Sequence, residues 1–231
     1  MKNLLRKYGV VIVLILLFGF ISTVYYSFTL STATRFNGYT IVIDAGHGGR
    51  DGGSIGVNGT IEKEINLKYA ETLKSKLVEM GYRVEMTRKT DDGLYSEFAK
   101  NKKISDLNER MKIIKKANPN LMISIHMNSF SSSSARGAVT YYRIDDEASK
   151  SVADLVQKSL NVYCGARWET GKTGDYYILN NSYYTSILVE CGYLSNAEEE
   201  KLLNTDEYCN KITDSICKGV GLYFGSLTEP L

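Results

Sequence analysis

The chain has 231 residues, 43% of them hydrophobic, and a formal net charge of only +2. This length and hydrophobic content suit one domain with a well-buried core and are short for two. The 28 Lys and Arg residues are balanced by 26 Asp and Glu residues, so the chain lacks the strong positive field of nucleic-acid-binding proteins. We therefore expect no nucleic-acid partner.

The first 35 residues differ in character from the rest of the chain. Three cations at positions 2, 6 and 7 precede an almost unbroken apolar run over residues 10–21. This order is typical of an export signal, and the apolar length is intermediate between a cleaved signal peptide and a retained membrane anchor. The Ser-Thr-Ala at 31–33 is a weak cleavage site. We expect residues 1–35 to be a signal peptide or signal anchor, which attaches the protein to the membrane if uncleaved, and residues 36–231 to form one exported domain. A buried core helix is the alternative, but the segment has no polar face.

Strand-like and helix-like segments alternate through the rest of the chain. Apolar residues at 65, 69, 73 and 77 have helical spacing that stops at Gly81. We expect further helices over residues 106–117, 148–163 and 206–223, and strands over 41–43, 82–86, 121–125, 138–142 and 186–191. This alternation predicts a single α/β domain with a mainly parallel, twisted sheet covered by helices.

The four cysteines give no clear disulfide framework. Cys209 and Cys217 are eight residues apart on a predicted helix, which separates their Cα atoms by roughly 12 Å and puts them beyond disulfide reach. Cys191 lies in an apolar strand and is expected to be a buried thiol. No Cys-x-x-Cys spacing occurs, so zinc held by thiolates is disfavoured.

The chain contains only two histidines, and both follow predicted strands. His47 lies in Asp-Ala-Gly-His-Gly-Gly at 44–49, and His126 lies in Ser-Ile-His-Met-Asn at 124–128. In α/β folds the strand ends border the ligand cleft. Catalytic zinc takes three protein ligands from His, Asp or Glu and keeps one position for water. The pattern predicts a metallohydrolase whose third ligand is a carboxylate.

Glu62 is the best candidate for that third ligand. It stands 15 residues after His47, at the start of a predicted helix, and the glycine-rich loop between them can fold it back toward His47. The alternative is an ordinary first-turn acid, which the helix dipole stabilises by about 0.3–1 kcal/mol.

Glu190 is the candidate general acid and base, because it is a charged residue at the end of an apolar strand. The alternative is a structural ion pair with Arg88 or Arg110, although both arginines are more typical of packing and salt bridges. Asp44 is a candidate for orienting a metal-binding histidine through a hydrogen bond to the ring nitrogen that does not bind the metal. Its alternative is a turn acid at the end of a strand.

Two further segments are expected near the cleft. The polar segment 89–105 is either a solvated loop or a specificity loop beside the cleft. Tyrosines cluster just before Glu190 and could form a cleft wall, since tyrosine faces suit sugar rings and extended peptides. The clustered residues are Tyr176, Tyr177, Tyr183 and Tyr184.

Four motifs together give a specific resemblance. They are Ile-Val-Ile-Asp-Ala-Gly-His-Gly-Gly at 41–49, Glu-Lys-Glu-Ile-Asn-Leu at 62–67, Ser-Ile-His-Met-Asn at 124–128 and Leu-Val-Glu-Cys-Gly-Tyr-Leu-Ser-Asn at 188–196. In this order they resemble the signature segments of the zinc-dependent N-acetylmuramoyl-L-alanine amidases, the amidase_3 family. The resemblance extends over residues 39–224.

The resemblance implies a role for each candidate residue. His47, Glu62 and His126 would bind Zn²⁺, and Glu190 would be the catalytic carboxylate. Residues 36–231 would be the amidase catalytic domain. The substrate would be peptidoglycan, cleaved at the amide between N-acetylmuramic acid and the L-alanine of the stem peptide.

Within this family, the lack of wall-binding repeats and the lengthened segment before Leu107 resemble the spore-cortex amidases of endospore formers. Those enzymes prepare muramic acid for conversion to muramic δ-lactam, which marks cortex for germination, and some work with an accessory lipoprotein. The alternatives are a vegetative autolysin of the same chemistry, another exported zinc peptidase or deacetylase acting on peptidoglycan, or a metal-free wall-binding protein.

Overall fold

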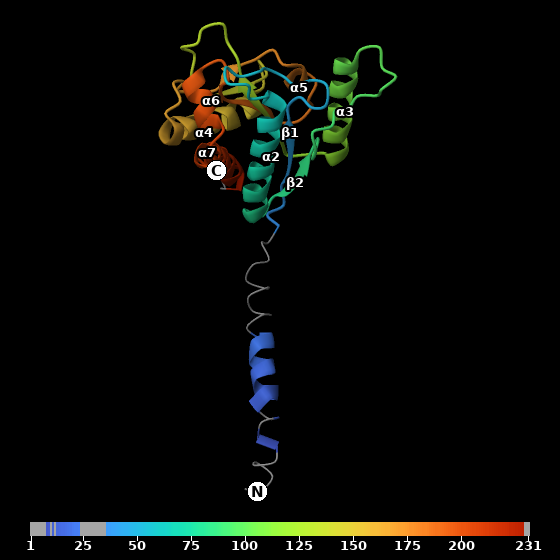
Figure 1. Ribbon diagram of the computed structural model, residues 1–231, viewed down its shortest axis with the longest axis vertical. Helices are drawn as coiled ribbons and strands as arrows, with labels where there is room; N and C mark the ends of the chain where they lie inside the picture. The colour runs from blue at the N-terminus through green and yellow to red at the C-terminus, as the bar shows by residue number, and fades with distance from the viewer. Residues whose placement is uncertain (1–7, 10, 12, 24–35, 229–231) are drawn as a thin grey trace. The chain divides into compact units, whose positions relative to one another are not determined.

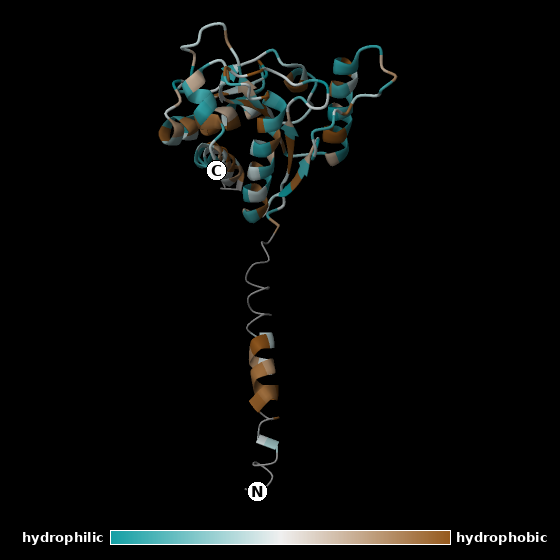
Figure 2. Cartoon of the chain, in the orientation of Figure 1, coloured by the Kyte–Doolittle hydropathy of each residue, from teal (hydrophilic) through white to brown (hydrophobic). Residues whose placement is uncertain are grey.

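The chain divides into two units, residues 1–35 and residues 36–231, and each is described by itself. The computed structural model describes residues 8–9, 11, 13–23 and 36–228. In the first unit, residues 13–23 form a helix that is mostly brown, the colour of apolar residues, in Figure 2. Among the described residues, no helix combines the length and apolar character needed to cross a membrane. The three N-terminal cations and the weak cleavage site lie outside the described residues.

The second unit contains a six-stranded sheet with the order β2-β1-β3-β6-β4-β5. The strands are β1 (Thr40–Ala45), β2 (Arg83–Met86), β3 (Leu121–Asn128), β4 (Val139–Tyr142), β5 (Lys172–Thr173) and β6 (Ser186–Tyr193). Four of the neighbouring pairs are parallel, but β4 runs antiparallel to β6. The sheet is therefore mixed. The reason lies in the connection from β3 to β4, a loop over residues 129–138 that contains no crossover helix.

The helices confirm the predicted α/β alternation. They are α2 (Glu62–Glu79), α3 (Lys102–Ala117), α4 (Glu147–Cys164), α5 (Tyr177–Asn180), α6 (Ala197–Leu203) and α7 (Asp206–Thr228). Helix α3 begins four residues before the predicted start, because the Asn101 side chain accepts a hydrogen bond from the Ile104 amide and caps the helix there. The short elements β5, α5 and α6 were not predicted.

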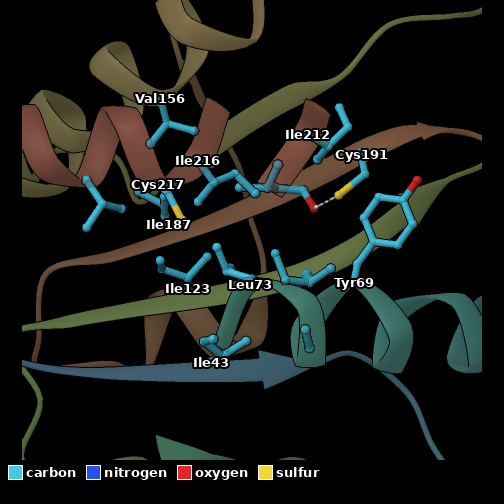
Figure 3. Packing of buried hydrophobic residues seen from close by; sticks show 14 of the residues in the cluster. Ile43, Tyr69, Leu73, Ile123, Val156, Ile187, Cys191, Ile212, Ile216 and Cys217 are labelled. Atoms are coloured by element: carbon cyan, nitrogen blue, oxygen red, sulfur yellow. Dashed lines mark hydrogen bonds between the residues drawn. The ribbon is translucent and has the colours of Figure 1, made fainter. Parts of the chain in front are cut away.

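The two faces of the sheet carry two separate apolar clusters. Alternate strand residues such as Ile43, Ile123 and Ile187 pack against helices α2, α4 and α7 on one face (Figure 3). Their neighbours Val42, Met122 and Leu188 face the other way, toward α3 and α5. Figure 1 shows α2 and α3 on either side of β1. The fold is a three-layer α/β/α domain.

All four cysteines are free thiols. Cys191 and Cys217 lie within the larger apolar cluster, and Cys209 is buried beside them. The expectation that Cys191 is a buried thiol is confirmed, as is the absence of a bond between Cys209 and Cys217.

Candidate active site

The carboxyl ends of three adjacent parallel strands bring the candidate residues together. Strand β3 lies between β1 and β6, and His126 is paired in register with Glu190 across β3 and β6. His47 follows the end of β1 by two residues, where the Gly46 amide bonds to the Ile125 carbonyl at 3.1 Å. This edge of a parallel sheet is where α/β enzymes bind their ligands.

Glu62 reaches the same place because its loop folds back on itself. Its amide bonds to the Ser54 carbonyl at 3.0 Å, and the next amide, of Lys63, bonds to the Gly52 carbonyl at 3.1 Å. Gly53 has φ +69°, and a Cβ there would lie 2.5 Å from a Glu62 carboxylate oxygen and 2.8 Å from the His47 ring. The loop therefore needs glycine at this position to bring the histidine and the glutamate together.

The three predicted ligands converge on one point. Glu62 Oε1 lies 2.9 Å from His126 Nδ1 and 3.2 Å from His47 Nε2. One ligand atom from each residue lies within 4.8 Å of the others, and no other such cluster occurs among the described residues. Two imidazole nitrogens and a carboxylate oxygen are a donor set that suits catalytic zinc. The residues present therefore fit the metal.

Glu62 is held as a carboxylate. It is only 3% exposed. Burial opposes its ionisation, but hydrogen bonds from His126 and His47 outweigh burial and hold its pKa well below the usual range. The Ser54 amide donates to its second oxygen at 2.8 Å, and the Asn66 amide group donates to Oε1 at 3.3 Å. The side chain is thus fixed in its orientation before a ligand binds.

The carboxylate beside a histidine ring is Asp51, not Asp44. Asp51 Oδ2 lies 3.0 Å from His47 Nδ1 without an aligned hydrogen bond, and His47 Nε2 lies 3.2 Å from Glu62 Oε1. Asp44 instead forms an ion pair with Arg110 at 2.7 Å and accepts a hydrogen bond from Ser124 at the same distance. The prediction for Asp44 was therefore wrong. An acid four residues after His47 was the only sequence signal for Asp51, and its role depends on the fold of the glycine-rich loop.

Glu190 differs from Glu62 in its surroundings. It is 7% exposed, and its Oε2 has no hydrogen-bond partner among the described residues, while Oε1 accepts from the Tyr176 hydroxyl at 3.5 Å. Burial raises the pKa of Glu190 to about 7. A carboxyl group with this pKa can both take and release a proton near neutral pH.

The suggested ion pair between Glu190 and an arginine is not formed. Arg110 bonds to Asp44 and to Asp106, and Arg88 donates to backbone carbonyls. Arg110 forms salt bridges and Arg88 binds backbone carbonyls, in line with the sequence expectation for both.

The converging residues border a cleft of about 470 Å³. Tyr176 and Tyr177 line it, whereas Tyr183 and Tyr184 are not among its lining residues. The prediction of a tyrosine wall therefore holds for half of the cluster.

Segment 89–105 contacts the loop that carries His47, and one of its residues lines the cleft. The Asp91 carbonyl accepts from the Gly49 amide at 2.5 Å, and its carboxylate pairs with Lys63 at 2.6 Å. At the other end of the segment, Lys103 lines the cleft. The segment thus contacts the loop that carries His47.

Fold and site together define an α/β enzyme with a two-histidine, one-glutamate candidate metal centre and a second carboxyl group beside it. Residues 41–221 match the Amidase_3 family model, described as N-acetylmuramoyl-L-alanine amidase. The chain belongs to this family and is an N-acetylmuramoyl-L-alanine amidase, an enzyme of peptidoglycan hydrolysis.

Individual relatives agree with the family assignment. The chain is 34% identical to the germination-specific N-acetylmuramoyl-L-alanine amidase of Bacillus subtilis, over 84% of this chain and 83% of that protein. It is 35% identical to the N-acetylmuramoyl-L-alanine amidase LytC of the same organism, over 81% of this chain but only 36% of LytC. Among solved structures, the CwlD amidase of Clostridioides difficile, in complex with the GerS lipoprotein, has a TM-score of 0.77 and 35% identity, covering 81% of this chain and 99% of that one.

Proposed function

We propose that this amidase is zinc-dependent, that His47, Glu62 and His126 bind the zinc, and that Glu190 is the catalytic carboxylate. The observation that carries the proposal is the convergence of the three ligand atoms within 4.8 Å at the carboxyl edge of the sheet. Glu190, paired in register with His126, lies at the same edge. Residues 36–231 are then the catalytic domain.

Each residue around the cleft has its own role in the proposed reaction. A zinc ion bound there supplies a Lewis acid that polarises the scissile carbonyl and acidifies water. Glu190 takes a proton from the attacking water and delivers it to the departing alanine nitrogen, a role that suits a carboxyl group with a pKa of about 7. The Tyr176 hydroxyl donates to Glu190 at 3.5 Å, and Asp51 lies on the Nδ1 side of His47, so that Nε2 is the nitrogen that acts as a ligand.

Digestion of purified peptidoglycan tests both the bond and the metal. We expect stem peptides with a free L-alanine amine and glycans with a free lactyl carboxyl, and we expect a chelator to stop the reaction until zinc is restored. Released D-alanine or acetate would instead indicate a carboxypeptidase or a deacetylase.

His126→Ala gives a second test of the metal site. The variant should lose the bound metal, because two ligands do not complete a zinc site. Metal analysis of the purified protein measures this directly, and an unchanged zinc content would contradict the ligand assignment.

We further propose a role in spore cortex maturation, where stem-peptide removal precedes formation of muramic δ-lactam. The similarity to the germination-specific amidase and to CwlD supports this role. Expression in Bacillus subtilis spores that lack the germination-specific amidase should restore muramic δ-lactam in the cortex. A vegetative cell-wall role is the second candidate, because the identity to LytC, an amidase whose name carries no germination role, is equally high. Spores that stay free of δ-lactam would favour it.

Two proposals concern the location of the enzyme. We propose that residues 1–35 direct export and either are cleaved or anchor the chain, which membrane fractionation and N-terminal sequencing of the mature protein can test. We also propose an accessory lipoprotein as partner, supported by the complex of CwlD with GerS. Co-purification with the lipoproteins of the host envelope should recover such a partner.

A further inference from the structure

The backbone of His47 adopts a conformation that side chains rarely take. Its φ is +62°, in the left-handed region. Among the described residues, the other non-glycine positions with positive φ are Asn118, which caps a helix, and Asp145. Asn and Asp tolerate this region because their short side chains bond to the local backbone. The side chain of His47 is instead directed at Glu62, so something else must hold its backbone.

Two buried arginines bind the loop that carries His47. Arg110 donates from Nη2 to the His47 carbonyl at 2.5 Å and from Nη1 to the Ala45 carbonyl at 2.7 Å. Arg88 donates to the Ala45 carbonyl at 2.9 Å and to the Gly46 carbonyl at 3.0 Å. Three consecutive carbonyls are therefore held by guanidinium groups, and Arg110 alone contacts the left-handed residue.

Arg110 is itself fixed by two carboxylates from different elements. Its Nη1 pairs with Asp44 of β1 at 2.7 Å, and its Nε pairs with Asp106 of α3 at 2.6 Å. Arg110 is 2% exposed. Because a guanidinium presents its donors in a rigid plane, fixing two of its edges also fixes the direction of the bond to His47.

An ion pair that served only folding would have no need to reach the His47 carbonyl. We propose that Arg110 is a positioning residue for the metal ligand: it holds His47 in the left-handed conformation and thereby sets the affinity of the site for zinc. The inference rests on the proposed zinc site. It assigns to Arg110 a role that acts through the His47 carbonyl, to which its Nη2 donates at 2.5 Å.

The test compares zinc affinity in Arg110→Lys, in wild type and in a control variant. Lysine keeps the charge but cannot bond to His47 and both carboxylates in one plane. The control is Arg143→Lys, since Arg143 also bridges a carbonyl, of Ser182 at 2.9 Å, and a carboxylate, of Asp146 at 3.0 Å, outside the cleft. Competition with a chromogenic chelator gives the dissociation constant, and the absorption spectrum of the cobalt-loaded protein reports the ligand geometry.

We expect Arg110→Lys to weaken zinc binding about 10- to 100-fold and to change the cobalt spectrum, as substitutions behind a metal ligand do. We expect Arg143→Lys to stay within about twofold of wild type. Arg110→Lys with wild-type zinc affinity and an unchanged spectrum would overturn the inference, even if its melting temperature fell.

A second variant decides the matter if Arg110→Lys does not fold. Asp106→Asn leaves Arg110 and its pair with Asp44 in place but loosens the guanidinium at Nε. Weaker zinc binding by this variant supports the inference, and unchanged binding overturns it. If the wild-type protein binds no zinc, both the proposed function and this inference fail. If the wild type binds zinc and the Arg110 variants bind it equally well, only this inference fails.

Discussion

The apolar core and the charged residues beneath the cleft at the carboxyl edge of the sheet are both buried, yet they are stabilised in opposite ways. Between the sheet and helices α2, α4 and α7, side chains such as Ile43, Leu73 and Ile123 are fully buried and wholly apolar (Figure 3). At the carboxyl edge, Asp44 is 1% and Arg110 2% exposed, and both carry charge. Buried charges are tolerated only when paired and hydrogen-bonded.

The two glutamates at the carboxyl edge also differ, in their hydrogen bonds and in the direction of their pKa shifts. The carboxylate of Glu62 receives hydrogen bonds at both oxygens, and its pKa is lowered. Glu190 keeps one oxygen unpaired, and burial raises its pKa to about 7. Two carboxyl groups whose environments move their pKa values apart are the usual sign of divided roles. This difference fits the proposed roles, Glu62 as a metal ligand and Glu190 as a proton carrier.

The largest effect is expected for Glu190→Gln, which removes the proposed proton carrier but keeps the shape of the side chain. The rate of amide cleavage should fall by about 10²–10⁴-fold. Zinc content and thermal stability should stay close to those of wild type, because no hydrogen-bonded network is broken. Turnover of purified peptidoglycan measures the activity, metal analysis measures the zinc content, and thermal denaturation measures the stability. Retained activity would contradict the assignment of Glu190.

A substitution in the apolar core should instead lower stability and leave zinc binding by the folded protein intact. Leu73→Ala should lower the free energy of unfolding by about 2–5 kcal/mol, because Leu73 is fully buried in the larger cluster. The folded fraction should still bind zinc. Urea denaturation measures the loss, with Leu222→Ala as the matched control, since the exposed Leu222 should cost no more than about 0.5 kcal/mol. Equal losses in the two variants would contradict the assigned core.

A smaller effect, dependent on pH, is expected at Asp44. Burial opposes its ionisation, but Arg110 and hydrogen bonds from Thr87 and Ser124 lower its pKa from 3.8 to about 2. A lowered carboxyl pKa stabilises the fold above pH 4, and this contribution of roughly 2 kcal/mol disappears as pH falls toward 2. The stability difference between wild type and Asp44→Asn should therefore narrow over that range. A difference that stays constant down to pH 2 would show that the charge of Asp44 contributes nothing.

The smallest effect is expected from a reductant. All four cysteines are free, so there is no covalent link to break. A single disulfide would contribute about 2–4 kcal/mol. The melting temperature should be the same with and without dithiothreitol, and a clear decrease on reduction would reveal a cross-link.

The sequence by itself determined the order of the main elements and indicated the four polar residues of the candidate site. Helical spacing from Ile65 to Leu77 and the buried run at 121–125 are local patterns, and each depends only on the period of its own backbone. The motifs around His47, Glu62, His126 and Glu190 lie at the ends of those elements, so their meeting follows from a parallel order of the strands.

Only the tertiary structure decided which neighbours those residues have. Asp51 rather than Asp44 lies beside the His47 ring, and Arg110 binds the His47 carbonyl across 63 positions of sequence. Strand β4 runs antiparallel because its connection to β3 is a short loop, and this too depends on how distant segments pair. Such contacts depend on strand register and on packing between elements that are distant in sequence. No periodic pattern in the local sequence therefore predicts them.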